Sequence, residues 1–133
     1  MFQRQQAAIV DRDSVCAGDD CESHEASFAT HPLATVSEFL QQAMRASPLA
    51  GIAGGQATWL IDTDGYGKGC IGVIAQQWDK PQLLLPDDTT VEQLFGDRPP
   101  TVFFRYWCQS SPEAVVQALR SGEPLPPRYA SEA

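Results

Sequence analysis

The sequence is poor in basic residues. Lysine and arginine together number 9 among 133 residues, against 17 aspartates and glutamates, which gives a net charge of −8 at pH 7. Proteins that bind nucleic acids through phosphates need basic side chains clustered on one face, whereas those of this chain are scattered. The composition therefore argues against nucleic acid as a partner. It is consistent with a solubilising surface or with an acidic surface that meets a basic partner.

Segments that would insert into a membrane or direct export are also lacking. No window approaches the ~20 apolar residues of a membrane-spanning helix, and residues 1–13 lack the apolar core of about 7 or more residues that a signal peptide requires. We therefore expect a cytoplasmic protein with no membrane partner. With 133 residues and no internal repeat, the chain fits a single domain over residues 1–133.

Few residues suit catalysis or metal binding. Cys16, Cys21 and His24, with His31 as a fourth candidate ligand, lack the paired spacing of structural zinc sites. Acidic neighbours oppose formation of the thiolate that a nucleophilic Cys16 would need. We therefore predict a protein that is not an enzyme, with no catalytic residues, no metal and no cofactor. The alternative is a small enzyme or ligand-binding domain that uses the loop from Cys16 to His24.

Two glycine-rich segments have structural interpretations. Residues 51–55 precede a predicted strand and lack the Lys-Ser/Thr pair of a phosphate-binding loop, so we interpret them as a flexible joint. Asp62 and Asp64 resemble the start of a calcium-binding loop. The later acid that closes such a loop is missing, however, and a hairpin turn over residues 62–69 explains the same residues.

Short strands are predicted in the middle of the chain and near both ends. Residues 57–61 and 70–75 are rich in apolar and β-branched residues, and they are followed by a third strand over residues 82–85. Residues 70–75 are apolar at successive positions, which indicates a strand covered on both faces. Residues 101–109 have the strongest β-propensity in the chain. A weaker strand is predicted within residues 7–15.

Alternation within the strand over residues 101–109 defines its two faces. Val102 and Phe104 fall on one face, and Phe103 and Arg105 fall on the other. We expect both faces to be covered in part.

Three helices are predicted from their caps and apolar stripes. Two hydroxyl residues are each followed by glutamate three positions later, which forms a capping box, and a third helix opens with Ser-Pro. Thr35 with Glu38 opens a helix over residues 36–46, and Ser111 with Pro112 opens a helix over residues 112–121. Thr89 with Glu92 opens a short helix that turns Val91, Leu94 and Phe95 inward and ends at Gly96. The element order predicts an α+β domain, with an antiparallel or mixed sheet of four to five strands and two to three helices packed largely on one face. The proline-rich residues 123–133 are expected to form a C-terminal tail.

Residues 11–31 are predicted to form an exposed acidic loop. Between positions 11 and 25, six carboxylates stand against one arginine, which leaves no apolar face to bury. Such acids repel one another unless they are solvated or meet a basic partner. Trp78 lies at a predicted strand end beside two glutamines, and tryptophan often anchors binding surfaces. The predicted partner-binding residues are Asp11, Asp13, Asp19, Asp20, Glu22, Glu25 and Trp78.

Several short segments are similar to segments of small uncharacterised bacterial proteins. They are SVCAGDD at residues 14–20, ATW at 57–59, AQQW at 75–78 and FRYWC at 104–108. In size, acidity and α+β composition the chain also resembles the immunity proteins encoded beside bacterial polymorphic toxins, and residues 118–126 are similar to the helix-then-proline ending of one such group. This resemblance implies a binding protein whose partner is a cognate toxin. We expect it to neutralise the toxin by occluding the active site.

Overall fold

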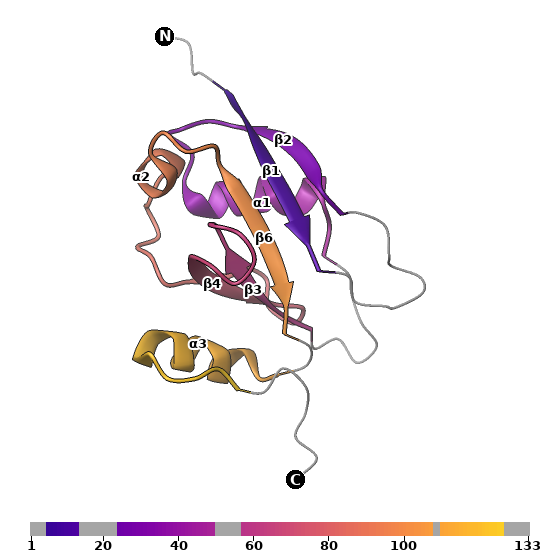
Figure 1. The fold of residues 1–133 in the computed structure, drawn as a ribbon, viewed down its shortest axis with the longest axis vertical. Coiled ribbons are helices and arrows are strands. Elements are labelled where there is room, and N and C mark those ends of the chain that lie inside the picture. Colours follow the sequence, from indigo (N-terminus) through magenta and orange to yellow (C-terminus); the bar gives the residue numbers. More distant parts are fainter. Residues whose placement is uncertain (1–4, 14–23, 50–56, 108–109, 127–133) are drawn as a thin grey trace.

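The computed structural model describes residues 5–13, 24–49, 57–107 and 110–126, which form one mixed β-sheet with helices on both faces (Figure 1). The elements in chain order are β1 (Gln6–Arg12), β2 (Ala26–Thr30), α1 (Val36–Ala46), β3 (Thr58–Asp62), β4 (Cys70–Ala75), β5 (Gln82–Leu83), α2 (Val91–Phe95), β6 (Thr101–Tyr106) and α3 (Pro112–Ser121). The predicted α+β class is confirmed.

The strands of the described residues follow the order β2-β1-β6-β3-β4-β5. Neighbouring strands are antiparallel except β1 and β6, which run parallel, so the sheet is mixed. The sheet has six strands, one more than the upper limit of the predicted four to five, and the additional strand is β2. The strand predicted over residues 82–85 is present as β5, although only its first two residues are in strand conformation.

Both ends of the acidic loop predicted over residues 11–31 lie in strands, so those parts of the prediction are wrong. Asp11 and Arg12 end β1, and residues 26–30 form β2, which pairs with β1 so that Phe28 lies opposite Ala8. Alanine and serine have little β-propensity, so pairing with β1 rather than local sequence determines this strand. Residues 14–23 lie outside the described residues.

The larger hydrophobic core lies between one sheet face and the helices α1 and α2. The capping box of α1 is confirmed, because the Thr35 hydroxyl accepts the Glu38 N–H at 3.1 Å and the Glu38 carboxylate accepts the Thr35 N–H at 2.9 Å. Val36, Phe39 and Leu40 are then fully buried along one stripe, as their spacing predicts. The sheet side of this core is formed by Val10, Trp59, Ile61 and Phe104 together with other buried residues.

The second capping box is displaced by one residue from its predicted position. Thr90 pairs with Gln93, instead of Thr89 with Glu92. The Thr89 hydroxyl donates to the carbonyl of Pro86 at 2.8 Å, which explains why it does not cap the helix. Within the described part of the chain, no helix combines the length and the apolar character needed to cross a membrane.

The third helix covers the opposite face of the sheet. Val115 and Val116 of α3 pack against Leu60 of β3 and Val73 of β4, and partly buried residues including Trp78 and Trp107 surround them. Two of the three helices therefore share one face, as expected, while α3 lies on the other. The part of that face formed by β2, β1 and β6 is covered by no helix of the described residues (Figure 1).

The Thr30 side chain offers a test of polar burial at the end of β2. Thr30 is 2% exposed, and its hydroxyl has no hydrogen-bond partner among the described residues. A buried hydroxyl without a partner costs stability, so Thr30→Val should raise the free energy of unfolding by about 1 kcal/mol in urea denaturation. Thr30→Ser keeps the hydroxyl and removes the methyl group, so it should lower stability. A Thr30→Val variant less stable than the parent would contradict this assignment.

Candidate functional site: an open groove on the sheet

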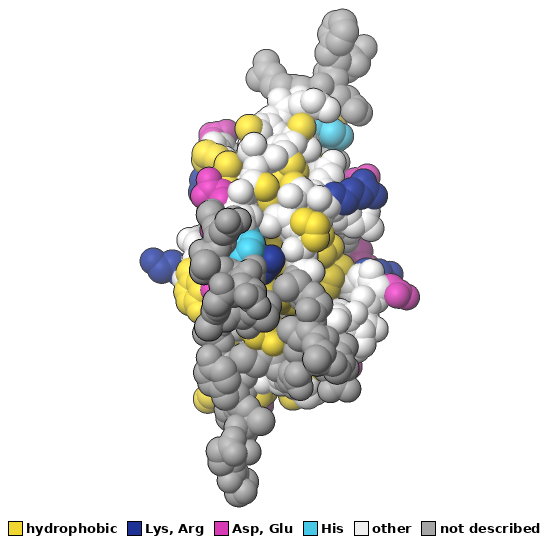
Figure 2. Space-filling model, turned by 90° about the vertical axis from the view of Figure 1, so that its right-hand side faces the viewer, with side chains coloured by type: hydrophobic (Ala, Val, Ile, Leu, Met, Phe, Trp, Pro, Cys, Tyr) yellow, Lys and Arg dark blue, Asp and Glu magenta, His cyan; other side chains and the backbone are white. Residues whose placement is uncertain are grey.

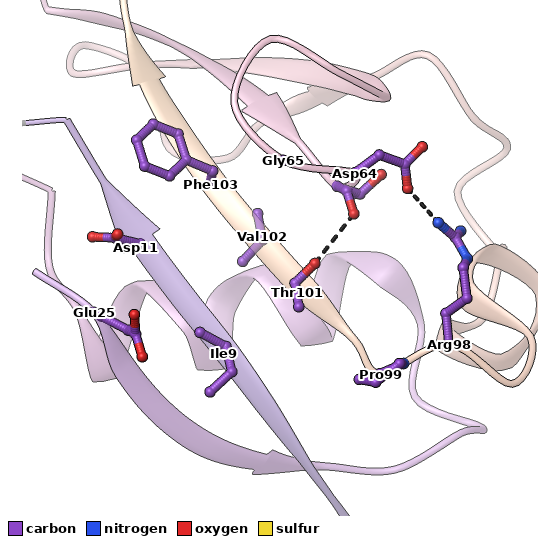
Figure 3. A pocket seen from close by; sticks show the side chains of 11 residues that line it. Ile9, Asp11, Glu25, Asp64, Gly65, Arg98, Pro99, Thr101, Val102 and Phe103 are labelled. Atoms are coloured by element: carbon purple, nitrogen blue, oxygen red, sulfur yellow. Dashed lines mark hydrogen bonds and ion pairs between the residues drawn. The ribbon is translucent and has the colours of Figure 1, made fainter.

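The uncovered half of the sheet contains a groove of about 600 Å³ (Figure 3). β1 and β6 form its floor, where their parallel pairing sets Ile9 beside Thr101 and Asp11 beside Phe103. The turn that follows β3 and the segment that leads into β6 form one side of it. The lining residues are Ile9, Asp11, Glu25, Thr63, Asp64, Gly65, Arg98, Pro99, Thr101, Val102 and Phe103. The groove therefore combines residues from four separate parts of the chain.

Two carboxylates lie at one side of this groove. Asp11 is near the end of β1 and Glu25 directly precedes β2, and Figure 3 shows both on the side away from Arg98. Glu25 is exposed, and the Asp11 carboxylate accepts the N–H of Arg12 at 2.8 Å. Both belong to the predicted partner-binding residues. The β1–β2 pairing thus brings this part of the predicted site together on one surface.

The other predicted site residues are placed differently. Asp13 follows β1, and its carboxylate accepts the N–H of Tyr106 at 3.0 Å, which ties the end of β1 to β6. Trp78 follows β4 at the end of the sheet opposite the β3–β4 turn, where it packs half-buried in the second core with α3. It is not part of the groove lining. The remaining three, Asp19, Asp20 and Glu22, lie outside the described residues.

An exposed ion pair lies on the opposite side of the groove. Arg98 pairs with Asp64 (Figure 3). Its guanidinium also donates to the carbonyls of Leu94 at 3.0 Å and Phe95 at 3.2 Å. These bonds hold Arg98 against the end of α2. The positive charge of Arg98 is matched locally by Asp64, and Asp11 and Glu25 place two further carboxylates on the other side of the groove.

Apolar and aromatic side chains lie beside these charges. Ile9 is 36% exposed, and Phe103 is partly buried. Tyr66, which is 52% exposed, meets Phe103 edge to face with the ring centres 5.2 Å apart. The alternation of residues 101–109 predicts Phe103 on the face opposite Phe104, but Phe103 is not among the predicted partner-binding residues. Only the position of α3 shows that this part of the face stays open.

A buried ion pair fixes the turn beside the groove. Asp62 is fully buried and accepts hydrogen bonds from Arg105 Nε at 2.9 Å and from the Gly67 N–H at 2.8 Å. Burial raises the pKa of the Asp62 carboxyl, and the hydrogen bonds from Arg105 and Gly67 oppose that rise in part. The guanidinium also lies over the rings of Tyr66 and Trp107, at 5.7 and 5.3 Å. The turn is therefore held in place by the ion pair of Asp62 with Arg105 and by the hydrogen bond from Gly67.

Of the four cysteines, Cys70 is the one that lies within the described residues. Cys70 is partly buried, and burial followed by the nearby Asp62 charge raises the pKa of its thiol, which disfavours the thiolate. Within the described residues, no three His, Cys, Asp or Glu side chains form a group suited to a metal ion. Cys16 and Cys21 lie outside those residues. The alternative based on the loop from Cys16 to His24 therefore stays a prediction.

Removal of Arg105 should lower the stability of the fold in a way that depends on the ionisation of Asp62. Arg105→Met leaves Asp62 without its counter-ion, so the free energy of unfolding at pH 7 should fall by about 3 kcal/mol. The pKa of Asp62 is already higher in the folded chain than in the unfolded chain. The stability of the folded chain therefore decreases as pH rises from the pKa of Asp62 in the unfolded chain to its pKa in the folded chain. Losing Arg105 raises this pKa further, so the deficit should shrink from about pH 7 towards about pH 4, as urea denaturation across this range can measure.

Arg98→Met is the matched control for this prediction. It removes an ion pair whose side chains are 55% and 44% exposed, against 14% and 0% for Arg105 and Asp62. An exposed pair is screened by water, so we expect a loss below about 1 kcal/mol with little dependence on pH. An Arg105→Met deficit that is independent of pH, or no larger than that of Arg98→Met, would contradict the role assigned to Asp62.

Comparison of the chain with models of known protein families, with curated proteins and with solved structures finds no match. The resemblance to immunity proteins therefore stays a prediction. The function has to be argued from the groove itself, whose acidic side and exposed apolar residues are its main chemical features.

Proposed function

We propose that this protein is a protein-binding module of the bacterial cytoplasm that neutralises a cognate toxin by occluding a basic active site. The observation that carries the proposal is the groove, where Asp11 and Glu25 lie beside Ile9 and Phe103 on an open sheet face. Carboxylates next to partly exposed apolar side chains complement a basic partner segment that also presents apolar groups. The proposed partner is thus defined by its positive charge and its apolar contacts.

The overall charge supports the same kind of partner. A net charge of −8 at pH 7 attracts a basic surface over a distance of about 8 Å at physiological ionic strength and increases the association rate. Toxins that act on nucleic acids have basic clefts for phosphate. An acidic inhibitor occupies such a cleft as phosphate would, and the same field repels nucleic acid from the inhibitor.

The rigidity of the groove floor also favours binding by occupancy. Along β1, Ile9 and Asp11 alternate with Val10, and along β6, Phe103 is followed by Phe104. Val10 and Phe104 are fully buried on the other face of the sheet. The exposed side chains are therefore held on a backbone whose other face is packed. A surface fixed before binding loses little conformational entropy when a partner docks, which increases affinity without any chemical step.

The product of the reading frame beside this one is the candidate partner to test. Its binding to the purified chain should be measured by titration calorimetry at several salt concentrations. The double variant Asp11→Asn with Glu25→Gln removes the two charges on the acidic side of the groove, so we expect a loss of about tenfold in affinity at low salt and a weaker salt dependence. The geometry of the side chains is retained in these substitutions, so the charge alone is tested.

Asp87→Asn with Asp88→Asn is the matched control, because these acids are exposed and do not line the groove. This variant has the same net charge as the groove variant and should retain the parent affinity within about threefold. Equal losses in the two double variants would mean that only the net charge matters, and would rule out the groove as the interface. If the neighbouring product does not bind the parent chain, the proposed toxin neutralisation is wrong.

A further inference from the structure

We propose that the outer edge of β2 binds a second copy of this chain, through antiparallel pairing of the two β2 strands. This proposal does not depend on the toxin-binding function. β2 is the last strand on its side of the sheet, and among the described residues no strand pairs with its outer side. An edge strand presents unpaired backbone N–H and C=O groups, which a strand of another chain can satisfy.

The two edges of the sheet differ in how they are protected. At the far edge, β5 is only two residues long and follows Pro81, and both features discourage pairing with another chain. β2 has five residues with the sequence ASFAT, which contains no charge, no proline and no glycine. Figure 2 looks onto this side of the molecule and shows hydrophobic and uncharged atoms across the middle of its upper half, with charged side chains towards the margins. Within the described residues, the β2 edge therefore lacks the charges, prolines and bulges that usually oppose association.

Apolar side chains flank this edge. Among the described residues, three large hydrophobic side chains are exposed, and two of them lie near β2. Ile9 pairs directly with Ser27 across the β1–β2 ladder, and Leu33, which is 64% exposed, follows β2 by three residues. Phe28 at the centre of β2 is only partly buried. Pairing with a second copy would cover the outer side of β2 and bury more of Phe28, which belongs to β2 itself.

A two-fold axis at Phe28 gives the longest pairing of two β2 strands. Ser27 of each copy then lies opposite Ala29 of the other, so small exposed side chains face each other without a clash. One step beyond the strand, Glu25 lies opposite His31 of the second copy. The Nδ1 atom of His31 accepts a hydrogen bond from the N–H of Leu33 at 3.2 Å. The proton of the ring is then on Nε2, which can donate a hydrogen bond to a carboxylate. The ends of this pairing are therefore complementary in hydrogen bonding.

The symmetry also determines how the two copies are arranged. An axis perpendicular to the sheet keeps the α1 faces of both copies on one side of the joined sheet, and both open grooves on the other side. A shift by one residue in either strand would set the exposed residues of one copy among the core residues of the other. Only shifts by an even number of residues keep both cores on one side, and the centred register pairs the most residues of the registers that do so.

Charge substitutions at Ser27 and Ala29 test the interface and its register together. Both residues are exposed, so the fold should tolerate the changes, which far-UV circular dichroism can verify. Ser27→Lys with Ala29→Lys sets lysines opposite lysines across the axis, whereas Ser27→Lys with Ala29→Glu sets each lysine opposite a glutamate. Sedimentation velocity should find the parent chain and the Lys/Glu variant at twice the chain mass of 14.5 kDa, and the Lys/Lys variant at 14.5 kDa.

Three results would overturn the proposal. The first is a parent chain that stays monomeric up to a concentration of about 1 mM, the weakest affinity in the usual range for specific association. The second is a Lys/Lys variant that remains dimeric, because the interface would then lie elsewhere. The third is a Lys/Glu variant that is as monomeric as the Lys/Lys variant, because the register centred on Phe28 would then be wrong.

Discussion

The two-sided pairing of β6 holds this fold together. β6 lies between β1, to which it is parallel, and β3, to which it is antiparallel, and it joins the N-terminal hairpin to the β3–β5 strands. Phe104 at its centre is fully buried, and Arg105 reaches across to Asp62 at the end of β3. Because β1 and β6 are about ninety positions apart in sequence, the sheet forms only when distant segments meet. The groove between them therefore exists only in the complete fold.

The open face follows from the number and size of the helices. An α-helix with its side chains is about 10 Å across and neighbouring strands are about 4.8 Å apart, so one helix covers roughly two strands. α3 packs against β3 and β4 and has no companion on its side within the described residues. Figure 1 shows α1 lying behind the sheet while the front of β1 and β6 stays free. The groove is thus the part of this face that a single helix cannot reach.

The sequence carried enough local information for most elements and too little for the site. All three helices and the strands β3, β4 and β6 lie within a few residues of their predicted positions, because caps, apolar stripes and β-branched runs are local signals. β2 was missed, since ASFAT has no strand signal of its own and forms by pairing with β1. The groove could not be predicted because it depends on which strands α3 leaves uncovered. Asp11 and Glu25 were predicted as partner-binding residues, but their meeting with Phe103 required the sheet order.

The placement of acids near an open sheet face has two physical explanations that use the same residues. Carboxylates around Ile9 and Phe103 discourage indiscriminate association of an exposed apolar surface, and they also select a basic partner. Solubility alone requires only that charge be spread over the molecule. Here six of the seventeen acids fall within fifteen consecutive residues. Two of the three acids that line the groove, Asp11 and Glu25, belong to that group, and the third, Asp64, pairs with Arg98. Clustering costs electrostatic repulsion that an even distribution would avoid, and a basic partner of the kind proposed above would remove this cost.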